Sequence, residues 1–218
     1  MSWAALTSGG KDSILAVQKA IDAGMDVSHF VTVVPKNQES YMFHSANLAA
    51  VPVMAGRCGA EYAEIRSEGI KEEEVADMET GLKSLNVEGI IVGAIESEYQ
   101  RSRVAKVAER LGLKLFAPLW KMDPLTLMQE VAKRLDAMIV VCAADGLGEN
   151  ILGKKIDEKI IDVLLSVQKS RRIHLAGEGG EYESLVLNAP CFSAPIEHSE
   201  MKFRYEGLRG EVIIERFW

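Results

Sequence analysis

The feature that most constrains the fold is a regular alternation of strand-like and helix-like segments over residues 1–120. The strand-like segments are short, apolar runs: 3–7, 27–34, 61–65, 89–93 and 113–116. The helix-like segments carry apolar residues at helical spacing: 12–23, 45–58, 70–85 and 98–111. Because parallel strands need a helical crossover to return, this alternation predicts an α/β fold with a doubly wound, five-stranded parallel sheet.

The pattern changes after Trp120. The expected helices there are 125–135 and 156–168, and the expected strands are 137–141, 183–187, 202–205 and 211–217. A tail rich in strands no longer fits a parallel sheet with crossover helices. The sequence therefore predicts two domains, residues 1–120 and a smaller C-terminal α+β domain at 121–218.

Composition excludes several classes of function. With 25 Lys and Arg against 32 Asp and Glu, the 218-residue chain has a formal net charge of −7, which argues against direct nucleic-acid binding. Cys58, Cys142 and Cys191 are widely spaced and form no CxxC pair, and no export signal is readable. No apolar run approaches the ~20 residues that span a bilayer. We expect a cytoplasmic protein with reduced thiols and no membrane contact.

The turn after the first strand combines glycines with charged and hydroxyl side chains: Ser8, Gly9, Gly10, Lys11, Asp12 and Ser13. It leads into a helix N-terminus, whose free N–H groups and dipole favour an anion. Lys11 adds positive charge, and Asp12 can hold Mg²⁺ directly or through water. The spacing is neither a Walker A loop nor G-x-G-x-x-G. A capped helix start is the alternative, but the complete pattern favours a phosphate site.

A second candidate segment follows the fourth predicted strand. Ligands of doubly wound sheets bind beyond the carboxyl ends of the strands, at the point where the strand order reverses. The residues of this segment that could bind a nucleotide or a carboxylate are Gly93, Ala94, Ser97, Gln100, Arg101 and Arg103. Without further context, a solvated helix start with incidental charges is the favoured interpretation.

A third segment, 177–184, places Glu178, Glu181 and Glu183 with Tyr182 in a glycine-rich turn. Carboxylates beside an aromatic ring suggest a site for a cation, and an acidic hairpin loop is the alternative. His44 precedes the second predicted helix and could line the same site, although a lone histidine is more often a surface or capping residue.

These segments carry a resemblance to known families. Residues 8–13 resemble the pyrophosphate-binding loop of the N-type ATP pyrophosphatases, whose fold is of the adenine nucleotide alpha hydrolase-like (HUP) type. Together with segment 93–104, the stretch Pro118-Leu119-Trp120 and the block 177–183, nearly the whole chain resembles the diphthine–ammonia ligase family. Ser184 departs from the pattern, because threonine is usual there.

The resemblance implies amidation of the diphthine carboxyl on translation elongation factor two, through an acyl-adenylate, with release of AMP and pyrophosphate. ATP, Mg²⁺ and ammonium would be consumed or bound. Ser8, Gly9, Gly10, Ser13, Gly93 and Ala94 would bind ATP together with Lys11 and Asp12. We expect catalytic roles for Lys11, Asp12, Glu178 and Glu181. We expect substrate contacts from His44, Ser97, Gln100, Arg101, Arg103, Tyr182 and Glu183.

Two other functions stay open. One is another adenylating enzyme, for example one that thiolates tRNA, although the paired cysteines or basic module typical of such enzymes are not found here. The other is a non-catalytic ATP-binding module of the universal-stress type, which would not require Lys11 and Asp12. A homodimer is compatible with the sequence, and no glutaminase segment is recognisable, which favours free ammonium as the nitrogen source.

Overall fold

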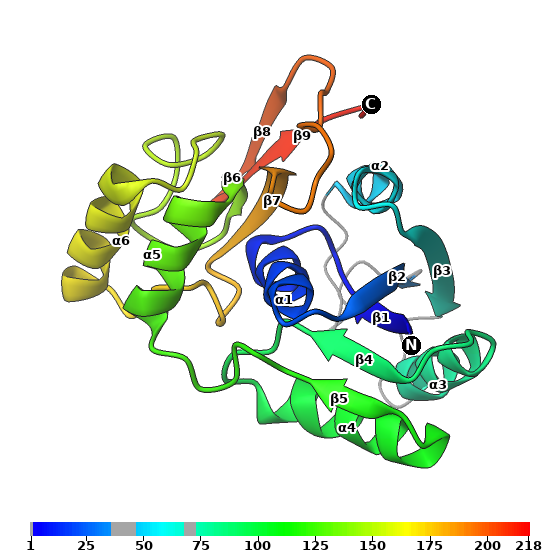
Figure 1. Ribbon diagram of the computed structural model, residues 1–218. Coiled ribbons are helices and arrows are strands. Elements are labelled where there is room, and N and C mark those ends of the chain that lie inside the picture. The colour runs from blue at the N-terminus through cyan, green and yellow to red at the C-terminus, as the bar shows by residue number, and fades with distance from the viewer. Residues whose placement is uncertain (1, 36–46, 68–72) are drawn as a thin grey trace.

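The first half of the chain forms a parallel sheet in the order β3-β2-β1-β4-β5 (Figure 1). Its strands are β1 (Ser2–Leu6), β2 (Asp26–Pro35), β3 (Glu61–Ser67), β4 (Gly89–Val92) and β5 (Lys114–Phe116). Every neighbouring pair is parallel. The structure, a computed structural model, describes residues 2–35, 47–67 and 73–218. The strand order reverses between β1 and β4, so the expected ligand-binding edge lies there.

Helices cover both faces of this sheet. Ala5, Phe30 and Ile91 pack in one core with α1 (Lys11–Asp22) and α2 (Val51–Arg57). Their sequence neighbours Ala4, Val31 and Ile90 pack in a second core with α3 (Glu73–Lys83) and α4 (Glu98–Leu111). Successive strand residues point to opposite faces, so runs apolar at every position are buried between two helix layers. This confirms the predicted doubly wound α/β fold.

The second half forms an antiparallel sheet in the order β7-β6-β9-β8. Its elements are α5 (Pro124–Arg134), β6 (Asp136–Cys142), α6 (Glu158–Ser170), β7 (Tyr182–Asn188), β8 (Lys202–Glu206) and β9 (Arg209–Ile213). Asp123 and Asp157 cap the two helices by accepting N–H groups of their first turns. The smaller α+β part is thus confirmed.

Most predicted boundaries differ from the structure by one to three residues, and two differ by more. The strand expected at 211–217 ends at Ile213, because Lys202, at the start of β8, is the last residue that pairs with it. The helix expected at 45–58 is shorter: a 3₁₀ turn, η1 (Leu48–Ala50), leads into α2. Asn47 has φ of 56°, a left-handed conformation that a right-handed helix cannot contain.

The two sheets share the face on which α1 lies. One continuous hydrophobic core includes Ile14 and Met54 from the first half and Val140 and Val186 from the second. The backbone N–H of Val186 in β7 donates to the Gly9 carbonyl at 2.9 Å. Figure 1 shows α1 between the parallel sheet and the antiparallel one. The second half therefore packs directly against the glycine turn, and a division at residue 120 stays a prediction.

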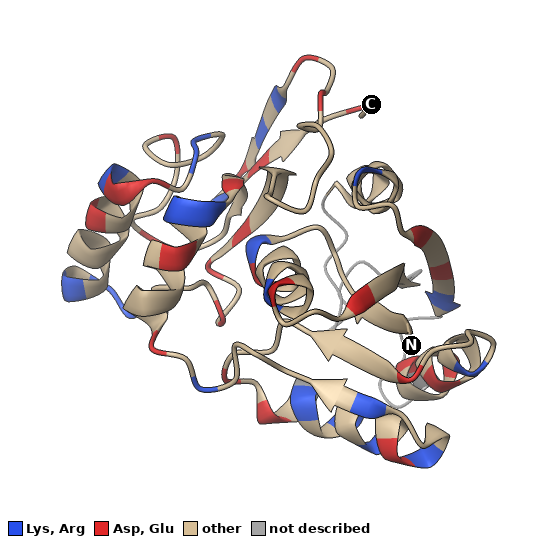
Figure 2. Cartoon of the chain, in the orientation of Figure 1, with Lys and Arg blue, Asp and Glu red and all other residues tan. Residues whose placement is uncertain are grey.

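Charged residues of both signs alternate along the outer helices α4, α5 and α6 (Figure 2). Within the described part of the chain, no helix is both long and apolar enough to cross a bilayer.

Candidate active site

The glycine turn between β1 and α1 forms the floor of the site. Gly9 has φ of 79°, which glycine adopts without strain, and its N–H donates to the Thr7 hydroxyl at 3.0 Å. Helix α1 begins at Lys11 after Gly10, and no side chain of the turn itself caps it. The Ser13 hydroxyl donates back to the Gly10 carbonyl at 3.0 Å. The turn is thus held by its own hydroxyl groups and provides no side-chain cap for the helix N-terminus.

The turn after β4 touches the same helix start. A Cβ atom on Gly93 would lie 2.6 Å from the backbone carbonyl carbon of Asp12, closer than real contacts allow. Only glycine permits this approach, which brings Ala94 and Ser97 to the cavity beside Asp12. The expected meeting of the two turns at the switch point is observed.

The second half supplies the third wall. The Lys11 N–H donates to the Ser184 hydroxyl at 3.1 Å, and the Lys11 ammonium donates to the Ala176 carbonyl at 2.6 Å. The same ammonium lies 5.3 Å from the centre of the Tyr182 ring. Lys11 is therefore fixed by residues more than 160 positions away in the chain.

The glycine turn, the turn after β4 and the wall supplied by the second half enclose a cavity of about 510 Å³. Its size falls within the ~300–1,000 Å³ of small-molecule sites. Hydroxyl, charged and glycine residues from both halves line it: Thr7, Ser8, Gly10, Lys11, Asp12, Ser13, Thr32, Gly93, Ser97, Gly177, Glu178, Gly179, Gly180, Glu183 and Ser184. Apolar side chains such as Val31, Val33 and Val104 complete the lining and would suit a flat ring.

Asp12 has the chemistry of a cation ligand. Its Oδ2 accepts the Lys11 ammonium at 2.9 Å, whereas its Oδ1 is buried and accepts no hydrogen bond from the described residues. A buried carboxylate oxygen normally has a partner, so this one fits a metal ion or a ligand donor. Within the described ranges, no three metal-binding side chains gather. A magnesium ion would therefore take most of its ligands from phosphate oxygens and water.

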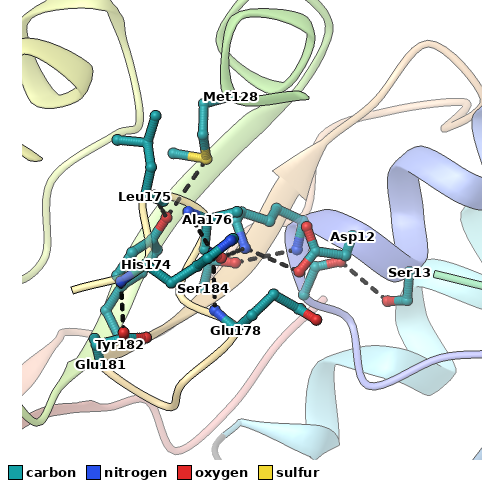
Figure 3. Close-up of polar contacts among 12 residues, drawn as sticks. Asp12, Ser13, Met128, His174, Leu175, Ala176, Glu178, Glu181, Tyr182 and Ser184 are labelled. Carbon is teal, nitrogen blue, oxygen red and sulfur yellow. Dashed lines mark hydrogen bonds and ion pairs between the residues drawn. The ribbon is translucent and has the colours of Figure 1, made fainter. Parts of the chain in front are cut away.

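Glu178 extends from its turn toward Asp12 (Figure 3). Loss of hydration in the cavity wall raises the pKa of its carboxyl group, and the negative charge of Asp12 raises it further. Its Oε2 accepts the backbone N–H of Glu96 at 3.4 Å. A carboxylate with a raised pKa is a stronger base than an ordinary glutamate.

Glu181 and Tyr182 hold the turn, and Tyr182 also lines the cavity. The two oxygens of Glu181 accept the backbone N–H groups of His174 at 2.6 Å and Gly179 at 2.8 Å. The buried Tyr182 hydroxyl donates to the Leu175 carbonyl at 2.7 Å, and burial raises its pKa. Glu181 is absent from the cavity lining, so its contacts differ from the catalytic role expected of it.

The arginines of segment 93–104 turn away from the cavity. The Arg101 guanidinium stacks on Trp120 at 4.6 Å, and that of Arg103 lies 3.5 Å from the centre of the Tyr99 ring. Neither arginine lines the cavity, in contrast to the contact expected of them. His44 and the side chain of Gln100 lie outside the described residues.

The structure also brings in residues that sequence reasoning missed. Thr32 in β2 lines the cavity and donates to the Thr7 carbonyl at 2.9 Å. His174 and Ala176 stand behind the third wall: the His174 ring accepts the Ala176 N–H, and the Ala176 carbonyl accepts the Lys11 ammonium. Ala176 acts through its carbonyl, which no side-chain pattern can reveal, and His174 carries no signal beyond its place shortly before the glycine-rich block.

The sheet order, the glycine turn at the switch point and the second antiparallel sheet define the class. The chain is an α/β protein of the adenine nucleotide alpha hydrolase-like type. Its backbone is similar to a crystal structure described as a predicted subunit of tRNA methyltransferase from Methanocaldococcus jannaschii, with a TM-score of 0.50 and 17% identity over 87% of this chain and 98% of that one. This likeness concerns the fold alone.

The sequence comparisons identify the family, which the likeness of fold does not. The family model described as the diphthamide synthase N-terminal domain matches residues 1–115, and the model of its C-terminal domain matches residues 123–218. The chain belongs to the diphthamide synthase family, an enzyme family of carbon–nitrogen ligases.

Several curated relatives carry the name diphthine–ammonia ligase. The human protein is 36% identical and the bovine one 34%, each over 90% of this chain and 82% of the relative. The Schizosaccharomyces pombe protein is 32% identical over 88% of this chain, which spans 35% of that longer relative.

Proposed function

We propose that this chain is a diphthine–ammonia ligase that acts in the cytoplasm on translation elongation factor two. It would use ATP and ammonium to convert the diphthine carboxyl group to an amide. One observation carries the proposal: the complete loop 8–13 lies at the switch point, with Lys11 held from the second half and one Asp12 oxygen unpartnered among the described residues. Family membership and the cavity behind this loop support the same conclusion.

The first chemical step would be adenylation. A carboxylate oxygen of diphthine attacks the α phosphorus of ATP, and the bond from that phosphorus to the oxygen leading to the β phosphorus breaks. Negative charge grows on the departing pyrophosphate. The start of α1, the Gly9–Gly10 turn and the Lys11 ammonium are preorganised for this charge, because each is already fixed by other contacts.

Magnesium would bind beside this loop and neutralise charge on the phosphates. Asp12 is the residue that would hold it, through the buried Oδ1. Lys11, bound to the other oxygen, keeps the carboxylate turned so that Oδ1 stays available. Both residues therefore contribute to the position of the phosphates rather than to proton transfer.

The second step would be aminolysis of the acyl-adenylate. Ammonia attacks the acyl carbon, the bond to the AMP oxygen breaks, and one proton leaves the nitrogen. Glu178 is placed to accept protons from the incoming ammonium, because its carboxylate faces the cavity and its pKa is raised. Glu178 and Glu183, both in the lining, would also attract the quaternary ammonium group of diphthine.

The proposal is tested with elongation factor two that bears diphthine. The protein, ATP, Mg²⁺ and ammonium are incubated with it, and mass spectrometry follows conversion of the carboxyl group to the amide. Parallel reactions omit ammonium or ATP. We expect amide only in the complete reaction, together with AMP and pyrophosphate.

Other products would point to other functions. ADP and phosphate would contradict attack at the α phosphorus. ATP that stays bound and intact with every substrate present would favour the non-catalytic ATP-binding module. Pyrophosphate release that depends on tRNA and not on the elongation factor would favour a tRNA-modifying enzyme.

A further inference from the structure

His174 organises the third wall of the cavity from behind. Its Nδ1 accepts the backbone N–H of Ala176 at 3.2 Å and that of Glu178 at 3.5 Å (Figure 3). Its own backbone also takes part, since the N–H donates to Glu181 and the carbonyl accepts the Gly177 N–H at 2.9 Å. One imidazole nitrogen thus serves two N–H groups of the same turn.

The two backbone groups held by His174 belong to residues that act in the site. Ala176 turns its carbonyl to the Lys11 ammonium at 2.6 Å, and Glu178 sends its carboxylate into the cavity. Between them, Gly177 has φ of 77°, a conformation favoured only by glycine. The imidazole therefore fixes the turn in which one side faces Lys11 and the other faces the ligand space.

The opposite side of the ring faces the switch point. Nε2 lies 3.6 Å from Oε2 of Glu96, in the turn after β4, and the Glu96 N–H donates to the Glu178 carboxylate at 3.4 Å. Because Nδ1 accepts hydrogen bonds, the proton of the neutral ring lies on Nε2, toward Glu96. His174 connects the turn of the second half with the turn after β4 of the first half.

We propose that His174 is a positioning residue of the ATP site: its Nδ1 holds the turn 174–178 so that Ala176 orients Lys11 toward the phosphates and Glu178 faces the substrate. The inference rests on the proposed function for the identity of the ligand. His174 touches neither the cavity nor the reacting atoms, so its effect passes through Lys11 and Glu178.

Three substitutions separate positioning from general damage. In His174→Asn, the side-chain oxygen is bonded to Cγ just as Nδ1 is in histidine, and it accepts the same N–H groups. In His174→Leu, a methyl group stands there and accepts nothing. His198→Leu, which removes a half-buried ring that contacts the Ser199 carbonyl far from the cavity, controls for the loss of an imidazole.

Two measurements are made on each variant of the full chain. Hydrogen–deuterium exchange of peptides covering 174–180 reports whether the turn is held, independently of any activity. Calorimetry with ATP and Mg²⁺, and steady-state amidation, report Kd, KM and kcat. For His174→Leu we expect exchange about tenfold faster and ATP affinity about tenfold weaker, the effect of losing hydrogen bonds to a fixed group. His174→Asn and His198→Leu should each stay within about threefold of wild type, because neither loses the acceptor at Nδ1.

The outcomes decide between alternatives. Unchanged exchange and unchanged ATP affinity in His174→Leu would overturn the inference. Faster exchange with unchanged ATP affinity and unchanged KM and kcat would also overturn it, since the site would then not use the turn. If the wild type binds ATP but does not form the amide, the proposed function fails, while exchange and affinity still test His174. Absence of ATP binding by the wild type would overturn both.

Discussion

The two glycine-rich turns that border the cavity differ in how many of their polar groups are already hydrogen-bonded within the protein. The first turn, residues 8–13, provides no side-chain cap of its own for α1 and leaves one Asp12 oxygen without a partner among the described residues. In the second turn, residues 177–184, both oxygens of Glu181 and the Tyr182 hydroxyl are bound to backbone groups of Gly179 and of the adjoining residues His174 and Leu175. Similar sequences of glycine and charge therefore produce one turn that can receive a ligand and one that is mostly self-supporting.

This difference shows that a charged side chain in a turn does not by itself indicate a contact with a ligand. A carboxylate that accepts two backbone N–H groups is already satisfied and has little to offer a ligand. Glu178 is the exception in the second turn, because its carboxylate extends into the cavity. Substitutions at these positions test whether the two turns differ in this way.

The largest effect is expected at Asp12. Asp12→Asn keeps an acceptor toward Lys11 but removes the negative charge that would hold Mg²⁺. Pyrophosphate release should fall by about 10³-fold, the cost of losing a preorganised charge at a reacting phosphate. A coupled pyrophosphate assay measures this, and circular dichroism checks that the fold persists. Release near the wild-type rate would remove Asp12 from the ligand-binding turn.

The second largest effect is expected at Glu178. Glu178→Gln should slow amide formation by about 10²-fold, the usual contribution of a general base, while adenylation persists. Single-turnover assays distinguish the two, because acyl-adenylate should accumulate. Equal loss in both steps would show that Glu178 belongs with the phosphate site instead.

The same substitution has a pH-dependent effect on stability. The pKa of Glu178 is raised above its usual 4.5 in the folded protein, so the folded state holds the proton more tightly than the unfolded state. Stability from this group is then lost as pH rises from about 4.5 through the raised value. Urea unfolding from pH 4 to 8 should show Glu178→Gln gaining on the wild type as pH rises. A gap that stays constant with pH would contradict the raised pKa.

A smaller effect is expected at Glu181. Glu181→Gln replaces one carboxylate oxygen by an NH₂ group that cannot accept, so one of the two hydrogen bonds that hold the second turn is lost and the free energy of unfolding should fall by about 1 kcal/mol. Amidation should fall only about tenfold. Exposed Glu109→Gln in α4 is the matched control for loss of a carboxylate. A fall in amidation as large as the fall in pyrophosphate release expected for Asp12→Asn, with an unchanged free energy of unfolding, would indicate that Glu181 is a catalytic residue.

The smallest effects are expected at Ser184, where the two turns meet. Ser184→Ala removes the acceptor of the Lys11 N–H and should cost about 1 kcal/mol of unfolding free energy. Ser184→Thr keeps the hydroxyl and should stay within about 0.5 kcal/mol. Urea unfolding of the pair tests whether the hydroxyl joins the turns, and equal stability of both variants would argue that it does not.

Much of the fold could be predicted because its signals are local. The apolar runs at Ala4–Ala5 and Ile90–Ile91 indicated strands buried on both faces, and both are so. Gly9, Gly10 and Asp12 could be singled out because their chemistry is contiguous in the chain. The start of α2 was misplaced because apolar spacing continues the helix through Asn47 and cannot reveal that the backbone of this residue is left-handed.

Roles within the site were harder to predict, since they depend on which way a side chain turns. Arg101 and Arg103 follow the switch-point strand, as expected, but Trp120 and Tyr99 provide aromatic faces that hold their guanidinium groups. The aromatic rings compete with a ligand for the two guanidinium groups, and Trp120 is not adjacent to Arg101 in the sequence. Residue type therefore indicated the segment but not the contact.

The strand and helix pattern, the phosphate-type turn and the family could all be recognised in the amino-acid sequence, because periodicity and contiguous motifs are local properties of the chain. Only the tertiary structure decided that Ala176 holds Lys11, that His174 stands behind Glu178, and that Cys58 and Cys191 lie with their sulfurs 3.3 Å apart. The first of these contacts joins α1 to the second half of the chain, and the last joins the end of α2 to it. Their geometry depends on how two apolar faces fit together, which no short stretch of sequence specifies.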